Sequence, residues 1–123
     1  MKKFILPLVL LISLCFSCQE ETIPSTACQI ENPLQEMDWL KIIIEDLEGS
    51  SLTEYMYISQ ALRGSETVFL VQNCCPFCNT VTPVYDCGGV LLGLLGNGEN
   101  GIDPTTIKNS KVIWKPENFS CNI

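Results

Sequence analysis

The cysteines are the residues of this sequence best suited to chemistry, and five consecutive positions read Cys74-Cys75-Pro76-Phe77-Cys78. Cys75 and Cys78 have the Cys-x-x-Cys spacing of thiol-disulfide exchange proteins. Such a site places its first thiol at a helix N-terminus, where the helix dipole lowers the thiol pKa. The residues after Cys78 are Asn-Thr-Val-Thr-Pro, a β-branched and proline-containing run that predicts no helix. The cluster is therefore predicted to be structural, with disulfide exchange through Cys75 and Cys78 as the alternative.

Metal binding is a second chemistry that these cysteines could support. Structural zinc sites use cysteine pairs at short spacing, and thiolates could come from Cys74, Cys75, Cys78 and Cys87. However, no second Cys-x-x-Cys pair follows, and the sequence contains no histidine. We therefore predict no metal site and no cofactor.

The N-terminus indicates which redox compartment the cysteines meet. Two lysines precede an apolar run that ends at Ser17-Cys18, the pattern of an export signal too short to span a membrane. Ser17-Cys18 resembles the lipobox of bacterial lipoproteins, although Cys15 stands where that pattern usually has an aliphatic residue. We expect residues 1–17 to be a lipoprotein signal peptide and Cys18 to be acylated, each buried methylene adding about 0.8 kcal/mol to membrane binding. Ordinary signal peptidase cleavage, with Cys18 left as a thiol, is the alternative.

An oxidising compartment favours disulfides among the cysteines that remain. Six remain after Cys15 and Cys18 are set aside, an even number in a small exported chain, and they predict three bridges with 15 connectivities. Successive side chains on a strand point to opposite faces, so Cys74 and Cys75 are expected to have different partners. One of them is expected to reach Cys78 or Cys87, and the other a terminal cysteine. The six are Cys28, Cys74, Cys75, Cys78, Cys87 and Cys121.

Charge and composition exclude several classes of function. The chain has 14 acidic and 7 basic residues, and two of the basic ones, Lys2 and Lys3, would leave with the signal peptide. The remaining surface repels phosphate backbones, so we predict no nucleic-acid partner. Without histidine, neither a Ser-His-Asp nor a Cys-His arrangement exists, and we predict that the protein is not an enzyme.

One amphipathic helix is predicted near the start of the folded region. Residues 18–31 are predicted to be the lipidated cysteine and a tether, and residues 32–123 a single small domain. Asn32-Pro33 is typical of a helix start, with Gln35 placed to complete a capping box. The helix is predicted from Pro33 to Glu48, where Gly49 ends it. Its apolar residues recur every three or four positions, at Leu34, Met37, Leu40, Ile44 and Leu47, and are widened by Trp39, Ile42 and Ile43.

The remainder of the sequence is predicted to form strands. Residues 53–63 and 66–72 are β-rich and are separated by Arg63-Gly64-Ser65, which indicates a hairpin. Further strands are predicted at 81–86, 90–95 and 111–115, with a short helical turn capped by Asp103-Pro104. The order predicts a disulfide-stapled α+β fold, in which one N-terminal helix packs on an antiparallel sheet of four or five strands.

A resemblance adds to this interpretation. The helix, the run YMYISQALRGSETVFLV, the cysteine cluster, VYDCGGVLLGLLGNGENGI and KVIWKP together resemble a group of small exported lipoproteins of Bacteroidota type that have no established function. The resemblance covers residues 28 to 116 and carries no catalytic residue over. Gln19-Glu20-Glu21 also resembles the signal that sends such lipoproteins to the outer face of the outer membrane.

These observations favour a lipid-anchored interaction or accessory module of the cell envelope. Its expected location is the outer membrane, with surface exposure, and its expected partners are the membrane, through the anchor, and a protein. Two alternatives stay open. One is an envelope thiol-disulfide exchange protein using Cys75 and Cys78, and the other is an inhibitor or immunity-type protein whose partner contacts the open sheet face.

Overall fold

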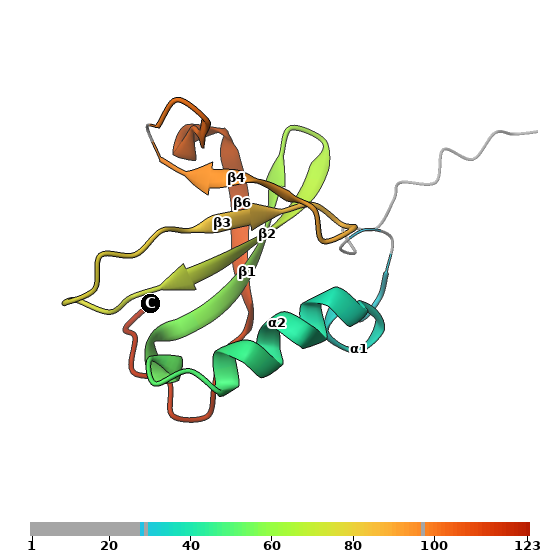
Figure 1. Ribbon diagram of the computed structural model, residues 1–123. Helices are drawn as coiled ribbons and strands as arrows, with labels where there is room; N and C mark the ends of the chain where they lie inside the picture. Colours follow the sequence, from blue (N-terminus) through green and yellow to red (C-terminus); the bar gives the residue numbers. More distant parts are fainter. Residues whose placement is uncertain (1–27, 29, 97) are drawn as a thin grey trace, which may run out of the picture.

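The computed structural model describes residues 28, 30–96 and 98–123, which form one main helix beside a sheet (Figure 1). The helices are α1 (Pro33–Glu36) and α2 (Asp38–Glu48), and short 3-10 turns occupy η2 (Thr53–Tyr55) and η3 (Pro104–Thr106). The strands are β1 (Met56–Arg63), β2 (Glu66–Asn73), β3 (Pro83–Tyr85), β4 (Leu91–Leu95), β5 (Gly101–Ile102) and β6 (Ile107–Trp114). The predicted signal peptide, Cys18 and the tether up to residue 27 lie outside the described residues.

The α+β fold class is confirmed, but the predicted sheet was wrong in two respects. The sheet has six strands in the order β5-β4-β3-β2-β1-β6, and β5 runs parallel to β4 while the other pairs are antiparallel. Strand β5 was not predicted, because two residues inside a glycine-rich loop are too few to show the alternation of apolar and polar residues that indicates a strand. Strand β6 also begins at Ile107, earlier than predicted, and pairs with β1 at the other side of the sheet.

The predicted single helix is interrupted at Met37. The backbone of Met37 is extended, with φ −99° and ψ 102°, and its carbonyl accepts the N–H groups of Leu40 and Lys41 at the start of α2. The side chain of Met37 is nevertheless buried, so the break directs an apolar residue into the core. The predicted capping box is also wrong, because the Asn32 N–H donates to a carboxylate oxygen of Glu36 instead.

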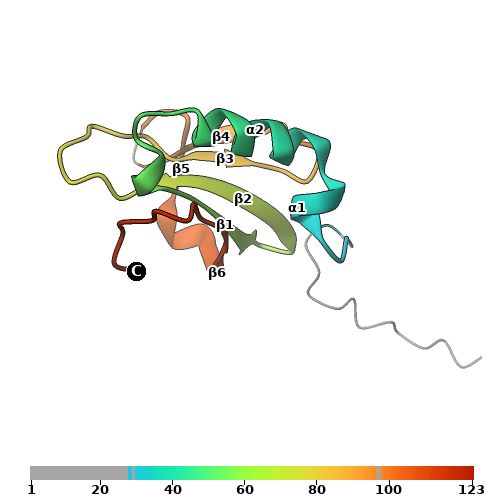
Figure 2. The same ribbon diagram turned by 90° about the horizontal axis from the view of Figure 1, so that it is seen from below.

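The core consists of two clusters, one on each face of the sheet. On the face that carries α2, Met37 and Leu40 pack with Ile58, Phe69 and Val71. Figure 2 shows α2 lying along this face. On the opposite face, Val84 and Ile102 belong to a second cluster, whose other members are Ala61, Val68 and Leu70. Successive residues of a strand point to opposite faces, so β2 is buried on both sides along Val68–Val71.

The buried face of α2 is narrower than its sequence predicts. Leu40 is fully buried, as expected for the centre of the apolar face, but it is the one residue of α2 that is. Trp39 is half-buried and packs edge-on against Phe69 at 5.5 Å between ring centroids. Ile42, predicted to widen the apolar face, is 59% exposed. Ile42 therefore lies toward solvent and does not contribute to the contact between α2 and the sheet.

Candidate functional site: the cysteine pairs and the β4 surface

The six predicted disulfide cysteines form three pairs. Cys28 pairs with Cys87 and Cys74 with Cys121, with Cα–Cα distances of 5.7 and 5.9 Å. The third pair is Cys75–Cys78, at 5.4 Å. The pairing agrees with the expectation that Cys74 and Cys75 separate, one toward Cys78 or Cys87 and the other toward a terminal cysteine. Two bridges thus fasten the two ends of the domain to the sheet.

The Cys75–Cys78 bridge closes a turn that projects from the sheet. The Asn73 side-chain oxygen accepts the Cys75 N–H at 2.7 Å, and the Cys75 carbonyl accepts the Cys78 N–H. Phe77, between the two cysteines, is 93% exposed. Irregular chain follows until β3 begins at Pro83, so the turn does not start a helix. A helix dipole therefore does not act on either sulfur.

The structure does not gather the four cysteines considered for zinc. Cys74 and Cys87 belong to two different bridges, while Cys75 and Cys78 form the third. Within the described residues, no three His, Cys, Asp or Glu side chains are grouped as metal ligands. Asp103 instead caps η3 as predicted. Its carboxylate accepts the backbone N–H and the hydroxyl of Thr105, and these bonds lower the pKa of Asp103.

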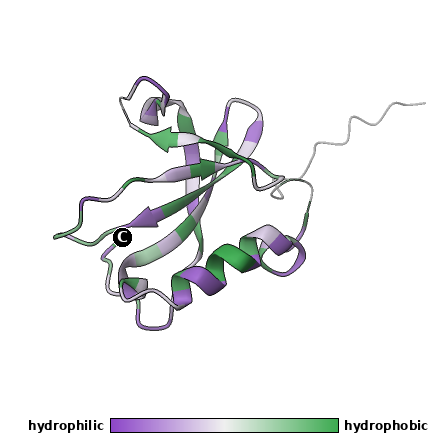
Figure 3. Ribbon diagram, viewed as in Figure 1, coloured by the Kyte–Doolittle hydropathy of each residue, from purple (hydrophilic) through white to green (hydrophobic). Residues whose placement is uncertain are grey.

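Apolar side chains gather on the exposed surface of β4 and the chain next to it. We call this set, whose five members are given below, the β4 surface. Figure 3 shows the hydrophobic colour along β4. A depression of about 400 Å³ lies within it, lined by Val81, Leu94, Leu95 and the glycine-rich loop that follows. Its members, with their exposed fractions, are Val81 (64%), Val90 (60%), Leu91 (53%), Leu92 (36%) and Leu94 (41%). Large apolar patches on a protein surface mark interaction sites.

Strand β4 is paired along its full length on one side only. Strand β5 pairs with Leu94 and Leu95, so it covers the C-terminal end of β4, and among the described residues no strand lies beside Leu91 and Leu92 on that side. On the other side, Leu91 lies opposite Tyr85, and a register shift follows between Val84 and Tyr85. The N-terminal half of β4 is thus an open sheet edge with apolar side chains.

The opposite sheet edge, β6, is built differently. It exposes Lys108 and Lys111, its pairing with β1 contains two register shifts, and Asn109 has a positive φ of 54°. Lysines and bulges at an edge prevent another strand from pairing there. The β4 edge contains neither a lysine nor any other charged residue.

The turn before β4 is held firmly by three interactions. Gly89 has φ 80°, and a Cβ at this position would lie 2.6 Å from the Trp39 ring. The Trp39 indole N–H donates to the Cys87 carbonyl at 3.1 Å. A carboxylate oxygen of Asp86 accepts the N–H groups of Gly88 and Val90. The close helix contact and these bonds fix the direction in which β4 starts.

Charge is distributed unevenly around the β4 surface. Asp86 precedes β4 in the sequence, and Glu99 and Asp103 lie in the segments before and after β5. The sequence has no lysine or arginine from residue 64 to 107, the stretch that contains β2 to β5. Arg63, Lys108 and Lys111 lie instead on β1 and β6, toward the other edge. The segments that adjoin β4 and β5 are therefore acidic, and we call Asp86, Glu99 and Asp103 the acidic border.

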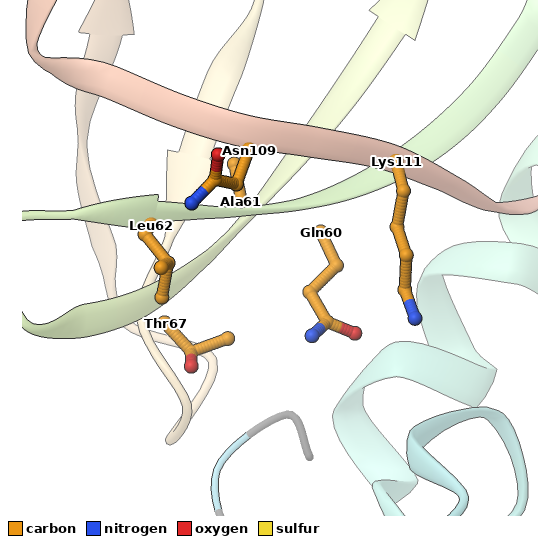
Figure 4. Close-up of a pocket in the computed structure, with 6 residues that line it drawn as sticks. All are labelled: Gln60, Ala61, Leu62, Thr67, Asn109 and Lys111. Carbon is orange, nitrogen blue, oxygen red and sulfur yellow. The ribbon is translucent and has the colours of Figure 1, made fainter. Parts of the chain in front are cut away.

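A smaller depression lies on the same face as α2, between β1 and β6. Its volume is about 250 Å³, and Figure 4 shows Gln60, Thr67 and Lys111 extending from the sheet into it. Lys111 lies opposite Gln60 in the pairing of β6 with β1. The depression presents amide, hydroxyl and ammonium groups, and none of its lining residues carries a carboxylate.

Comparison with known proteins identifies no relative of this chain. The chain matches no protein-family model, no curated protein and no solved structure. Within the described residues, no helix has the length and apolar character needed to cross a membrane. Sequence reasoning predicted the strand at 90–95 but assigned it no role. The nearest signal was the run Val-Leu-Leu-Gly-Leu-Leu, but such a run is equally typical of a strand that is buried on both faces.

Proposed function

We propose that this chain is a lipid-anchored interaction module of the cell envelope that binds a partner protein through the β4 surface. The anchor would be Cys18, acylated after removal of residues 1–17, and the tether would hold the domain near the outer membrane. The single observation that carries the binding role is the exposed apolar β4 surface at an open sheet edge. A small domain gains stability by burying such residues, so leaving five of them exposed favours a binding role.

The acidic border supports a protein partner over other classes of ligand. Asp86, Glu99 and Asp103 disfavour nucleic acid and anionic lipid head groups near β4. Protein interfaces have an apolar centre surrounded by a polar rim, and acidic segments next to the apolar β4 surface are consistent with that arrangement.

Site-specific photo-crosslinking in cells that produce the lipoprotein tests this proposal. A photoreactive amino acid at position 90, on the β4 surface, should give a discrete adduct with one protein. The matched position is 112, on the β6 edge, where the native Val112 is 41% exposed. The adduct should disappear when Leu91→Ser and Leu94→Ser are combined, because both changes remove apolar contact area. Equal adducts at positions 90 and 112, or an adduct that survives the double substitution, would contradict the proposal.

Thiol-disulfide exchange is a second candidate, favoured by the pairing of Cys75 with Cys78 in an exposed turn. In the chain-entropy model this short loop contributes about 2 kcal/mol, against about 4 kcal/mol for each long-range bridge, so its loss costs the fold least. In exchange, a partner's dithiol would give up two electrons and two protons. The Cys75–Cys78 bond would break to two thiols while the partner's disulfide forms.

Redox titration decides between the two candidates. The protein is equilibrated with defined ratios of reduced and oxidised glutathione, and free thiols are counted by alkylation and mass spectrometry. Exchange requires that Cys75–Cys78 open at potentials above about −300 mV, where structural bridges stay closed. If all three bridges resist reduction to the same potential, the exchange candidate is rejected and the binding role is unaffected.

A further inference from the structure

We infer that the β4 edge binds an extended segment of its partner as an added strand, and that this segment alternates apolar and basic residues. The inference rests on the proposed binding function and specifies the chemistry of the partner. Three observations support it: the open edge, the arrangement of the side chains on it, and the distribution of charge.

The open edge supplies backbone groups for pairing. Beside Leu91 and Leu92, no strand of the described chain lies on the outer side of β4, since β5 begins to pair only at Leu94. Unpaired N–H and C=O groups at a sheet edge are a template for another strand. The β6 edge, by contrast, carries Lys108 and Lys111 and is distorted by register shifts. One edge is therefore protected against strand addition while the other is not.

Side chains beside the open edge define what the added strand would present. Leu91 lies opposite Tyr85 and Leu94 opposite Pro83, which places both leucines on the face of the sheet that carries α2. Val81 lies beside Leu94 in the wall of the 400 Å³ depression. An added strand puts alternate side chains on this face. Its apolar residues would thus extend the surface made by Leu91, Leu94 and Val81.

Charge identifies the partner and argues against a second copy of this chain. A second copy would bring the same acidic segments to the interface, and each chain without residues 1–17 would carry 14 acidic and 5 basic residues. Like charges across an interface oppose association. A segment with lysine or arginine between its apolar residues would instead meet the acidic border with opposite charge. The partner segment is therefore basic and apolar in alternation.

Peptide binding to the full lipidated chain in nanodiscs of zwitterionic lipid tests the inference, with empty nanodiscs as the blank. The probe is a fluorescent ten-residue peptide in which valine and threonine alternate with lysine. One control peptide carries N-methyl groups on alternate residues, which remove backbone donors along one edge and keep every side chain. A second control peptide has glutamate in place of each lysine.

We expect the probe to bind at least tenfold more tightly than either control, and to slow amide hydrogen exchange at Leu91 and Leu92. Leu91→Ser should weaken binding at least fivefold, whereas Val112→Ser on the other edge should leave it unchanged. N-methylated peptide binding within threefold of the probe would overturn strand addition, although the photo-crosslinks at position 90 would still support the β4 surface as a binding site. If the crosslinks at position 90 fail while the probe still binds, the proposed function is refuted, but strand addition at the β4 edge is not. A dimer in sedimentation experiments that is lost in Leu91→Ser would overturn the basic partner, because the occupant would be a second copy.

Discussion

Leu40 offers a sharp test of how the helix is held to the sheet. Its side chain is fully buried among Met37, Ile58, Phe69 and Val71, whereas Ile42, two residues further along the same helix, is 59% exposed. Leu40→Ala removes three carbons from a closed environment and leaves a cavity, which costs about 2–5 kcal/mol. Ile42→Ala removes a similar amount of side chain from solvent and should change the free energy of unfolding by less than about 1 kcal/mol.

Thermal unfolding followed by circular dichroism, with disulfides intact, measures the difference. A loss of about 3 kcal/mol lowers the Tm of a domain of this size by about 12–24 °C. Leu40→Asp should be more damaging still, because it buries an unpaired carboxylate in a domain whose total stability is about 5–15 kcal/mol. Equal Tm values for Leu40→Ala and Ile42→Ala would refute the reasoning, since they would show that the α2 contact with β1 and β2 does not stabilise the fold.

Three further predictions concern the anchor, the bridges and the β4 turn. Cys18→Ala should move the protein from the membrane fraction to the soluble fraction, and detergent-phase partitioning that is unchanged would contradict lipidation at Cys18. Replacing Cys75 and Cys78 together by serine should cost about 2 kcal/mol, and replacing Cys28 and Cys87 about 4 kcal/mol, measured by urea unfolding; the reverse order would show that the chain-entropy estimate does not apply. Gly89→Ala should destabilise more than Gly64→Ala, because both glycines have positive φ but only at Gly89 would a Cβ meet another group, the Trp39 ring. Equal losses in the two alanine variants would mean that the Trp39 contact yields without cost.

The elements with a regular pattern of apolar residues were predicted from the sequence, whereas features that depend on tertiary contacts were not. The hairpin of β1 and β2 follows from two β-rich runs around Arg63-Gly64-Ser65, and its register brings Arg63 opposite Glu66. Met37 could not be predicted as a helix break, since leucine, methionine and isoleucine recur at helical spacing through it. Its extended backbone is set by the burial of its side chain, which depends on β1 and β2. Local pattern therefore gave the helix and its apolar face, but not the interruption.

The candidate site was less predictable than the fold. The pairing of the cysteines depends on how the strands are arranged. The sequence predicted that Cys74 and Cys75 have different partners, but it did not predict the full connectivity. The β4 surface could not be found from the run Val-Leu-Leu-Gly-Leu-Leu alone, because a run of this kind is equally typical of a strand buried on both faces, as β2 is. What exposes β4 is the shortness of β5 and the narrow buried face of α2. Both are properties of the assembled domain.

The bridges and the binding surface are connected at the turn before β4. Cys87 is bridged to Cys28, its carbonyl accepts the Trp39 indole N–H, and Gly89 lies against the same indole ring. The N-terminal segment, the helix and the start of β4 are thus joined at one point. An exposed apolar strand at a sheet edge is prone to rearrange and aggregate unless its neighbours hold it. The Cys28–Cys87 bridge and Trp39 fix the start of β4, so the exposed edge can keep its conformation without a partner. A partner strand would therefore meet a preorganised edge, and preorganisation lowers the entropic cost of binding.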